Sequence, residues 1–259
     1  MPTAASSCAE AAAAFCAARR AGRGLAAWPG AFPATLEEAY AIQRACIDGW
    51  GDGVAGWKVG RITGADAARH GAERFIGPIF AGTVAMAGPG AVFRAIAGGT
   101  ALVECELVAV LGRDACEAGG DLAALVGEWR IAIEVAGSPL AAIDTLGPLA
   151  SVACFGNNNG VLLGPPIAGW RARALGALGC ATYIDGALVG RDTARRLPGG
   201  PWAGLAFALA EAGRRGVALA RGAIIATGAI TGMHPVTPGA QVRADFGALG
   251  TLACRVVAG

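Results

Sequence analysis

The sequence predicts an α+β protein in which a rolled or sandwiched mixed sheet follows an N-terminal helical segment. Helical spacing prevails early in the chain, short strand-like runs cluster late, and the βαβ alternation of a parallel sheet is absent. A chain of 259 residues can form one large domain or two small ones. We expect a division near residue 85. Residues 1–85 then hold helices, a lysine-bearing strand and a loop, and residues 86–259 form a β-rich catalytic part that carries a metal site.

Two helices are expected before the first strand. Residues 4–22 form an alanine-rich helix, and Thr35 with Glu38 gives a capping box for a second helix that ends near Gly49. Residues 51–56 (GDGVAG) then match the dinucleotide-binding spacing GxGxxG. A helix precedes this segment and a strand follows it, which reverses the order that a pyrophosphate loop requires. We therefore reject dinucleotide binding.

Lys58 lies in the next strand-like run, between Trp57 and Val59. A lysine buried there has a lowered pKa and suits proton transfer. Alternatively, its stem lies on the surface while the ammonium reaches water. After a short helix at 64–72, the segment 75–84 contains proline and glycine and is expected to be a loop that closes over a site.

Three acids lie on apolar strand-like runs. In residues 101–113 (ALVECELVAVLGR), Glu104 and Glu106 share one face, because side chains two positions apart on a strand point the same way. Residues 129–136 place Glu134 among apolar neighbours. Three such acids resist burial together unless a cation lies between them, and oxygen ligands select a hard ion such as Mg²⁺ or Mn²⁺. The alternative is that they lie at strand ends or on a solvated face.

Two later segments carry polar groups suited to binding. The asparagines at 157–159, ahead of Gly160, form a tight turn or offer amides to a carboxylate. The glycine-spaced loop 227–232 holds a carboxylate through backbone amides and threonine hydroxyls, or is a structural turn. Other expected elements are a polar turn at 116–121, a hairpin turn at Asp185-Gly186 and a helix at 202–215.

Composition excludes several classes of partner. The net charge is +2 and the arginines form no basic stripe, so no nucleic-acid partner is expected. Apolar residues make up 54% and charged residues 15%, which favours a homo-oligomer. The eight cysteines include no CxxC pair and are interpreted as small buried side chains in a reducing cytosol. No run reaches the ~18 apolar residues of a membrane span, and no signal peptide is expected, so we predict a cytoplasmic protein.

Six segments occur together in the order and spacing of one enzyme family. They are AYAIQ (39–43), GWKVG (56–60), VECELVAVLGRD (103–114), IEVAGS (133–138), NNNGVLLGPP (157–166) and ATGAITGMHPVTPGAQV (226–242). On these segments the chain resembles the fumarylacetoacetate hydrolase superfamily, and within it the 2-keto-4-pentenoate hydratase and 4-oxalocrotonate decarboxylase branch. The resemblance implies a mixed β-roll surrounded by helices and a homo-oligomeric assembly.

The same resemblance implies roles for particular residues. A magnesium or manganese ion is expected at Glu104, Glu106 and Glu134, and Lys58 is expected to be catalytic or to orient substrate. The residues implied as substrate contacts are Ser138, Asn158, Thr227 and Thr231.

The activity implied is that of a lyase. A hydratase of this branch adds water at C4 of a 2-hydroxy-2,4-dienoate of the 2-keto-4-pentenoate type, giving a 4-hydroxy-2-oxo acid in the catabolism of aromatic compounds. The cation acts there as a Lewis acid while Lys58 or a bound water moves a proton. The alternatives are a 4-oxalocrotonate-type decarboxylase and an acylpyruvate hydrolase, although no His/Glu pair near the lysine strand supports the latter. Because Lys58 and the three glutamates are intact, a non-catalytic binding protein is disfavoured.

Three positions depart from the hydratase pattern. Pro139 follows Gly137-Ser138 where hydratases usually carry arginine, and Arg61-Ile62-Thr63 stands where Leu-Thr is familiar after the lysine strand. The acidic residue expected in the segment 77–84 is replaced, and the Pro-Ile-Phe there resembles the decarboxylase branch. The C5 substituent of the substrate, the choice between hydration and decarboxylation, and the number of subunits stay open.

Overall fold

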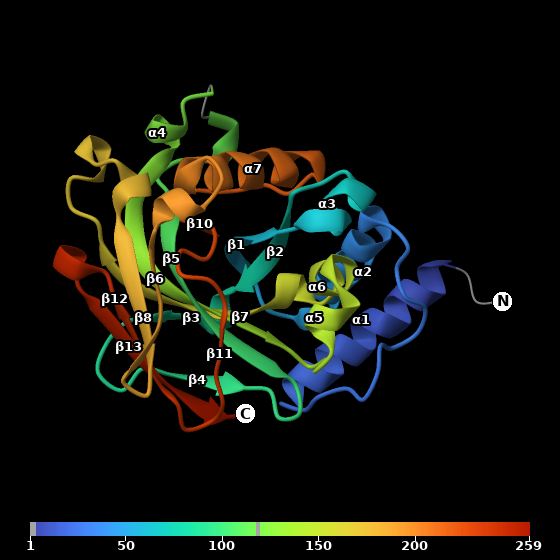
Figure 1. The fold of residues 1–259 in the computed structure, drawn as a ribbon. Helices are drawn as coiled ribbons and strands as arrows, with labels where there is room; N and C mark the ends of the chain where they lie inside the picture. Colours follow the sequence, from blue (N-terminus) through green and yellow to red (C-terminus); the bar gives the residue numbers. More distant parts are fainter. Residues whose placement is uncertain (1–3, 118–119) are drawn as a thin grey trace.

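A computed structural model describes residues 4–117 and 120–259, which form two β-sheets with helices around them (Figure 1). The eight-stranded sheet has the order β2-β1-β10-β5-β6-β7-β3, with β11 beside β5. Its strands are β1 (Val54–Arg61), β2 (Arg74–Phe80), β3 (Val84–Met86), β5 (Thr100–Leu111), β6 (Val126–Ser138), β7 (Asn158–Pro166), β10 (Ile224–Ala226) and β11 (His234–Pro235). The mixed α+β class expected from the sequence is confirmed.

The five-stranded sheet has the order β4-β13-β12-β8-β9 and lies on one side of the large sheet. Its strands are β4 (Val92–Ala95), β8 (Gly179–Ile184), β9 (Ala187–Thr193), β12 (Gln241–Asp245) and β13 (Thr251–Ala258). The helices are α1 (Ala4–Arg20), α2 (Leu36–Trp50), α3 (Gly64–His70), α4 (Leu122–Leu125), α5 (Ile143–Leu146), α6 (Pro148–Ala153) and α7 (Gly200–Arg214). Figure 1 shows α1, α2, α5 and α6 grouped on the side away from this second sheet.

The start of α2 confirms the expected capping box. Thr35 Oγ1 accepts a hydrogen bond from the Glu38 amide at 3.2 Å, and Glu38 Oε2 accepts one from the Ala34 amide at 2.7 Å. These bonds satisfy amides that a helix start otherwise leaves unpaired. At the other end, Gly51 has φ 85°, a left-handed conformation that glycine adopts readily, and the helix ends there.

The two faces of β5 have different surroundings. Cys105 points toward the five-stranded sheet, where its Sγ lies 2.9 Å from Thr182 Oγ1 of β8. Glu104, Glu106 and Val108 alternate with that face and therefore point to the other side of the large sheet. Val108 belongs there to a small buried cluster of apolar side chains from neighbouring strands, which also contains Ile79, Ala132, Val161, Leu163, Ile224 and Ala226.

The prediction of a loop at 75–84 is wrong, because most of this segment is strand β2. β2 pairs antiparallel with β1 over its whole length, and this ladder satisfies its backbone groups. β2 is an edge strand, so Pro78 does not interrupt a ladder on both sides. Residues 74–80 are therefore part of the sheet and not a loop that closes over a site. Strands from both sides of residue 85 share this sheet, since β1 lies beside β10.

Several shorter predictions are confirmed. Asp185 and Gly186 have φ values of 50° and 82°, as the tight turn between β8 and β9 requires. The expected helix at 202–215 is α7. All eight cysteines are free and six are buried. Residues 118–119 of the expected polar turn lie outside the described residues. Within the described ranges, no helix is long and apolar enough to cross a membrane.

Candidate metal and substrate site

Three carboxylates meet inside the large sheet. The β5–β6 register places Glu104 directly opposite Glu134, while Glu106 lies opposite Ala132. The exposed fractions of Glu104, Glu106 and Glu134 are 4%, 0% and 0%. One carboxylate oxygen from each residue lies within 4.8 Å of the other two. The acids therefore do not lie on a solvated face, which was the alternative left open by the sequence.

Each of these carboxylates keeps at least one oxygen without a hydrogen-bond partner among the described residues. Glu106 Oε2 accepts from the Gly228 amide at 2.8 Å, and Glu134 Oε1 accepts from Asn158 Nδ2 at 3.0 Å. Within the described ranges, Glu104 Oε1, Glu106 Oε1 and Glu134 Oε2 have no such partner. Buried polar atoms are normally paired, and an unpaired one costs free energy. Three unpaired carboxylate oxygens fit a hard divalent cation.

Lys58 supplies one positive charge beside the three acids. Its side chain is 5% exposed, and Nζ lies 3.3 Å from Glu134 Oε1. Three carboxylates and one ammonium leave a formal charge of −2, which one divalent cation balances. The structure thus places Lys58 in the interior and not at the surface.

Burial and mutual repulsion shift the pKa values of the charged groups in this cluster. Burial raises the pKa of Glu104 to about 7, and burial followed by repulsion from Glu134 and Glu104 raises the pKa of Glu106 well above its usual value. For Lys58, burial lowers the pKa, but attraction by Glu134, Glu104 and Glu106 outweighs burial and the net pKa is raised. The sequence predicted a lowered pKa for a buried Lys58. That prediction is wrong for Lys58 beside three carboxylates, because their attraction raises its pKa.

Two small residues flank Lys58 in the sheet. Lys58 lies opposite Gly77 of β2 and beside Ala226 of β10. A Cβ atom on Gly77 would lie 2.5 Å from the Gly156 Cα, so only glycine permits this close approach of two backbones. The approach brings the segment before β7 against the lysine strand.

A cavity of about 560 Å³ is lined by Lys58 and Glu104. Its polar lining includes Arg61, Asp66, Asp144, Asn157 and Arg196. The cavity therefore offers room for a small organic acid together with water, and its inner end carries the lysine and a carboxylate of the acidic cluster.

None of the four implied substrate contacts is among the described residues that line this cavity. Ser138 Oγ accepts from the Leu140 amide at 3.0 Å, and Thr227 Oγ1 donates to the Leu107 carbonyl at 2.8 Å. Thr231 Oγ1 lies 2.7 Å from Thr182 Oγ1 and 3.2 Å from His234 Nε2. Asn158 supports Glu134, as described above. Direct contact of these four residues with substrate stays a prediction.

The substrate contacts implied from the sequence include Asn158 but not Asn157, which does line the cavity. The run of three asparagines drew attention to this segment, but the pattern alone does not tell which of them faces the cavity. Gly156, beside it, also lines the cavity. The backbone of the segment decides this orientation.

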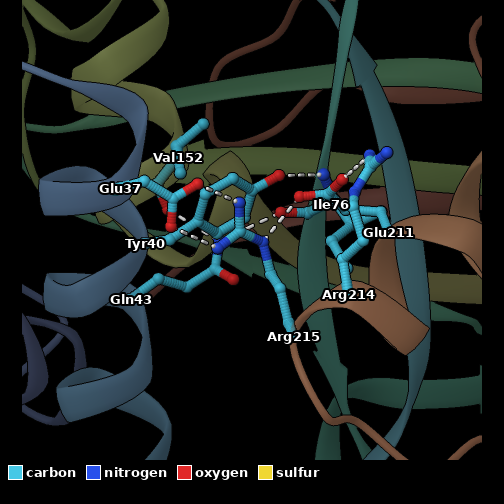
Figure 2. Close-up of polar contacts among 8 residues, drawn as sticks. All are labelled: Glu37, Tyr40, Gln43, Ile76, Val152, Glu211, Arg214 and Arg215. Carbon is cyan, nitrogen blue, oxygen red and sulfur yellow. Dashed lines mark hydrogen bonds and ion pairs between the residues drawn. The ribbon is translucent and has the colours of Figure 1, made fainter.

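A larger cavity, of about 910 Å³, lies between α2 and residues 214–223. None of the predicted site residues is among the described residues that line it. Figure 2 shows the polar network at its edge, in which Arg215 lies between Glu37 and Glu211. The Arg215 guanidinium also stacks 3.2 Å from the centre of the Tyr40 ring.

This network ties α2 to β2 and α6. Tyr40 Oη accepts from the Ile76 amide at 3.0 Å, and Gln43 Nε2 donates to the carbonyls of Ile76 and Val152 at 3.0 and 2.8 Å (Figure 2). The hydrogen bonds of Tyr40 and Gln43 to Ile76 hold β2 against α2, beside the lysine strand.

Comparisons with known proteins agree with this geometry. The family model described as fumarylacetoacetate (FAA) hydrolase C-terminal matches residues 64–257. The 4-oxalocrotonate decarboxylase from Pseudomonas putida G7, solved with magnesium and adipate, is 22% identical with a TM-score of 0.79, covering 96% of this chain and 97% of that one. Solved with calcium and acetate, it gives 23% identity and a TM-score of 0.73, covering 86% of each chain.

A fumarylpyruvate hydrolase from Pseudomonas aeruginosa, in complex with Mn²⁺ and pyruvate, is 19% identical with a TM-score of 0.51, covering 78% of this chain and 89% of that one. These likenesses establish a shared fold. No curated protein sequence matches the chain. Because the family model spans most of the sequence, the chain belongs to the fumarylacetoacetate hydrolase family and is an enzyme of that superfamily.

Proposed function

We propose that the protein is a metal-dependent hydratase that adds water to a 2-hydroxy-2,4-dienoate and yields a 4-hydroxy-2-oxo acid in the catabolism of aromatic compounds. One observation carries the proposal: three buried carboxylates with unpaired oxygens lie beside buried Lys58 at the inner end of a cavity. Glu104, Glu106 and Glu134 would hold Mg²⁺ or Mn²⁺. Solved relatives with this fold contain magnesium, calcium or Mn²⁺.

The chain's own residues would divide the work. A divalent cation, when bound, supplies Lewis acidity toward the carboxylate and 2-oxygen of a 2-oxo acid. Lys58 Nζ donates hydrogen bonds at the same inner end and moves a proton at the 2-oxygen of the substrate. Asn158 and the Gly228 amide hold Glu134 and Glu106 in position.

The proposed reaction has two stages. The proton of the 2-hydroxyl group leaves and a proton arrives at C5, which converts the dienol into a conjugated 2-oxo-3-enoate. The oxygen of water then bonds to C4, the electrons of the C3–C4 double bond move toward the 2-oxo group, and a proton ends on C3. The polar lining of the cavity supports this proposal, because the second stage needs water beside the substrate.

Decarboxylation of a 4-oxalocrotonate-type acid is the second candidate. It starts from the same electron withdrawal toward C2 but loses CO₂ and needs no attacking water. The Pro-Ile-Phe segment at 78–80 supports it, because this segment resembles the decarboxylase branch and has no acidic residue. An acylpyruvate hydrolase is less well supported, because no histidine is among the described residues that line the cavity.

Assembly and location belong to the same proposal. The exposed side chains of Leu188 and Val189 lie on β9, an edge strand of the five-stranded sheet. An exposed apolar edge supports a homo-oligomer. We place the protein in the cytoplasm, with a small organic acid as its partner and neither nucleic acid nor membrane.

The test is an assay with Mg²⁺ on 2-hydroxypenta-2,4-dienoate and, separately, on 4-oxalocrotonate, with EDTA-treated protein as the control. We expect loss of the dienol absorbance without release of CO₂, and no reaction after EDTA. Release of CO₂ from 4-oxalocrotonate without hydration of the dienol would select the decarboxylase. Failure of the metal-loaded protein on both substrates contradicts both proposals.

A further inference from the structure

The segment before β7 has an unusual backbone. Phe155, Gly156 and Asn157 have φ values of 56°, 63° and 59°, so three consecutive residues are left-handed. This conformation is uncommon outside glycine, and for a bulky residue such as phenylalanine it is an outlier. Backbone strain of this kind persists only where the surroundings enforce it, and it concentrates at functional sites.

Packing on both sides enforces the turn. The Phe155 ring is fully buried against Trp50 and Phe80, with ring centres 5.5 Å apart in each case. Gly156 lies against Gly77, where a Cβ on Gly156 would come within 2.4 Å of the Gly77 Cα. As a result the next residue, Asn157, is held in the lining of the cavity.

The Asn157 side chain is buried but unpaired. It is 5% exposed, and Oδ1 has no hydrogen-bond partner among the described residues. The neighbouring asparagines are both engaged: Asn158 Oδ1 accepts from the Gly160 amide at 3.1 Å, and Asn159 Nδ2 donates to the Arg94 carbonyl at 2.9 Å. A buried polar atom without a partner costs free energy unless a ligand or water pairs with it.

The chemistry of Oδ1 limits what can pair with it. An amide oxygen only accepts hydrogen bonds, so its partner must donate one. The carboxylate and the 2-oxo group of the substrate are themselves acceptors. Water and a C4 hydroxyl are donors. We propose that Asn157 Oδ1 holds the water that adds to C4, an inference that rests on the hydratase function proposed above.

In this role Asn157 is a catalytic residue that takes no proton. Its oxygen accepts one hydrogen bond from the water and directs the lone pair of that water toward C4. The new bond joins the water oxygen to C4, and the proton released by the water is balanced by the proton that C3 gains. The earlier proton transfer, between the 2-oxygen and C5, does not involve this water and therefore does not depend on Asn157.

The test compares two reactions in the Mg²⁺-loaded protein. Hydration of 2-hydroxypenta-2,4-dienoate needs the water, whereas exchange of the C3 protons of 2-oxopentanoate in D₂O needs only proton transfer. Asn157→Gly deletes the side chain and still accepts a positive φ, and Asn157→Asp keeps an acceptor oxygen. Asn159→Ala is the matched control, because Asn159 is bonded elsewhere.

We expect Asn157→Gly to lower kcat for hydration by about 10- to 100-fold, with KM and proton exchange within about twofold of wild type. Asn157→Asp retains more hydration than Asn157→Gly, and Asn159→Ala matches wild type. Thermal unfolding of each variant confirms that it is folded.

Three results would overturn the inference and leave the hydratase proposal standing. If Asn157→Gly hydrates the dienol at the wild-type rate, Asn157 does not hold the water. If the variant loses hydration and proton exchange equally, the residue only shapes the site. An Asn157→Asp variant less active than Asn157→Gly means that the partner is an acceptor, such as a substrate carboxylate. If wild-type protein exchanges protons but adds no water, the hydratase proposal itself fails, and the role of Asn157 fails with it.

Discussion

Glu104 and Glu134 lie directly opposite each other on β5 and β6, and both are buried. Like charges at such positions destabilise a sheet. Lys58 Nζ and Asn158 Nδ2 both reach Glu134 Oε1, at 3.3 and 3.0 Å, which offsets only part of the repulsion. A divalent cation is the partner that the remaining charge and the unpaired oxygens require.

Lys58→Met separates catalysis from metal binding. Loss of the ammonium removes the group that moves a proton, so we expect kcat for the dienol to fall by about 10²- to 10⁴-fold. The three carboxylates remain, so Mn²⁺ should bind at least as tightly as in wild type. Kinetics together with a Mn²⁺ titration check this. Unchanged turnover would exclude the proposed role, and lost Mn²⁺ binding would make Lys58 part of the metal site.

Asn158→Ala tests the support of the third ligand. Without its amide, Glu134 Oε1 loses the hydrogen bond that orients it, and Mn²⁺ affinity should fall by about 10- to 100-fold. Asn159→Ala is the control, since Asn159 bonds to Arg94 and Arg19 and not to the acids. Equal Mn²⁺ affinities in the two variants would show that the Asn158 contact does not hold Glu134.

Gly77→Ala tests the close approach beside the lysine strand. Its new Cβ would meet Gly156 Cα at 2.5 Å, so β2 and the left-handed turn must separate. We expect a loss of about 1–3 kcal/mol in the free energy of unfolding, together with a lower kcat. Gly53→Ala, whose Cβ meets nothing within 4 Å, should stay within about 0.5 kcal/mol of wild type. Urea unfolding measures both, and a Gly77→Ala protein of wild-type stability would contradict the close packing.

Arg215→Ala and Arg214→Ala should differ although both residues pair with Glu211. Arg215 pairs with both Glu37 and Glu211 and lies over the Tyr40 ring, so its removal should cost about 1–3 kcal/mol. The Arg214 side chain is 66% exposed, and its removal should cost less than about 1 kcal/mol. Equal losses of unfolding free energy, measured in urea, would show that the two arginines of Figure 2 contribute equally to stability.

The features that could be predicted from the sequence are those that depend on a local pattern of residues. Alternation placed Glu104 and Glu106 on one face, and the capping box at Thr35 and the turn at Asp185-Gly186 are short-range signals. Each of these features is decided within a few residues. The structure therefore reproduces them with little change.

Features that depend on distant partners were not predictable in the same way. β2 looks like a loop because of Pro78 and Gly77, and only its pairing with β1 makes it a strand. The choice of Asn157 as the cavity-facing asparagine depends on the contact between Gly156 and Gly77, which are far apart in sequence. The raised pKa of Lys58 likewise depends on carboxylates contributed by other strands.

The central claim is that Glu104, Glu106 and Glu134 form one divalent-metal site. Calorimetric titration of chelator-treated protein with Mn²⁺ tests it directly, with Glu106→Gln as the comparison, because this variant keeps the size of the side chain and removes its charge. We predict one Mn²⁺ ion per chain in wild type and an affinity lower by more than about 100-fold in Glu106→Gln. Equal binding by both proteins, or no binding by wild type, would contradict the claim.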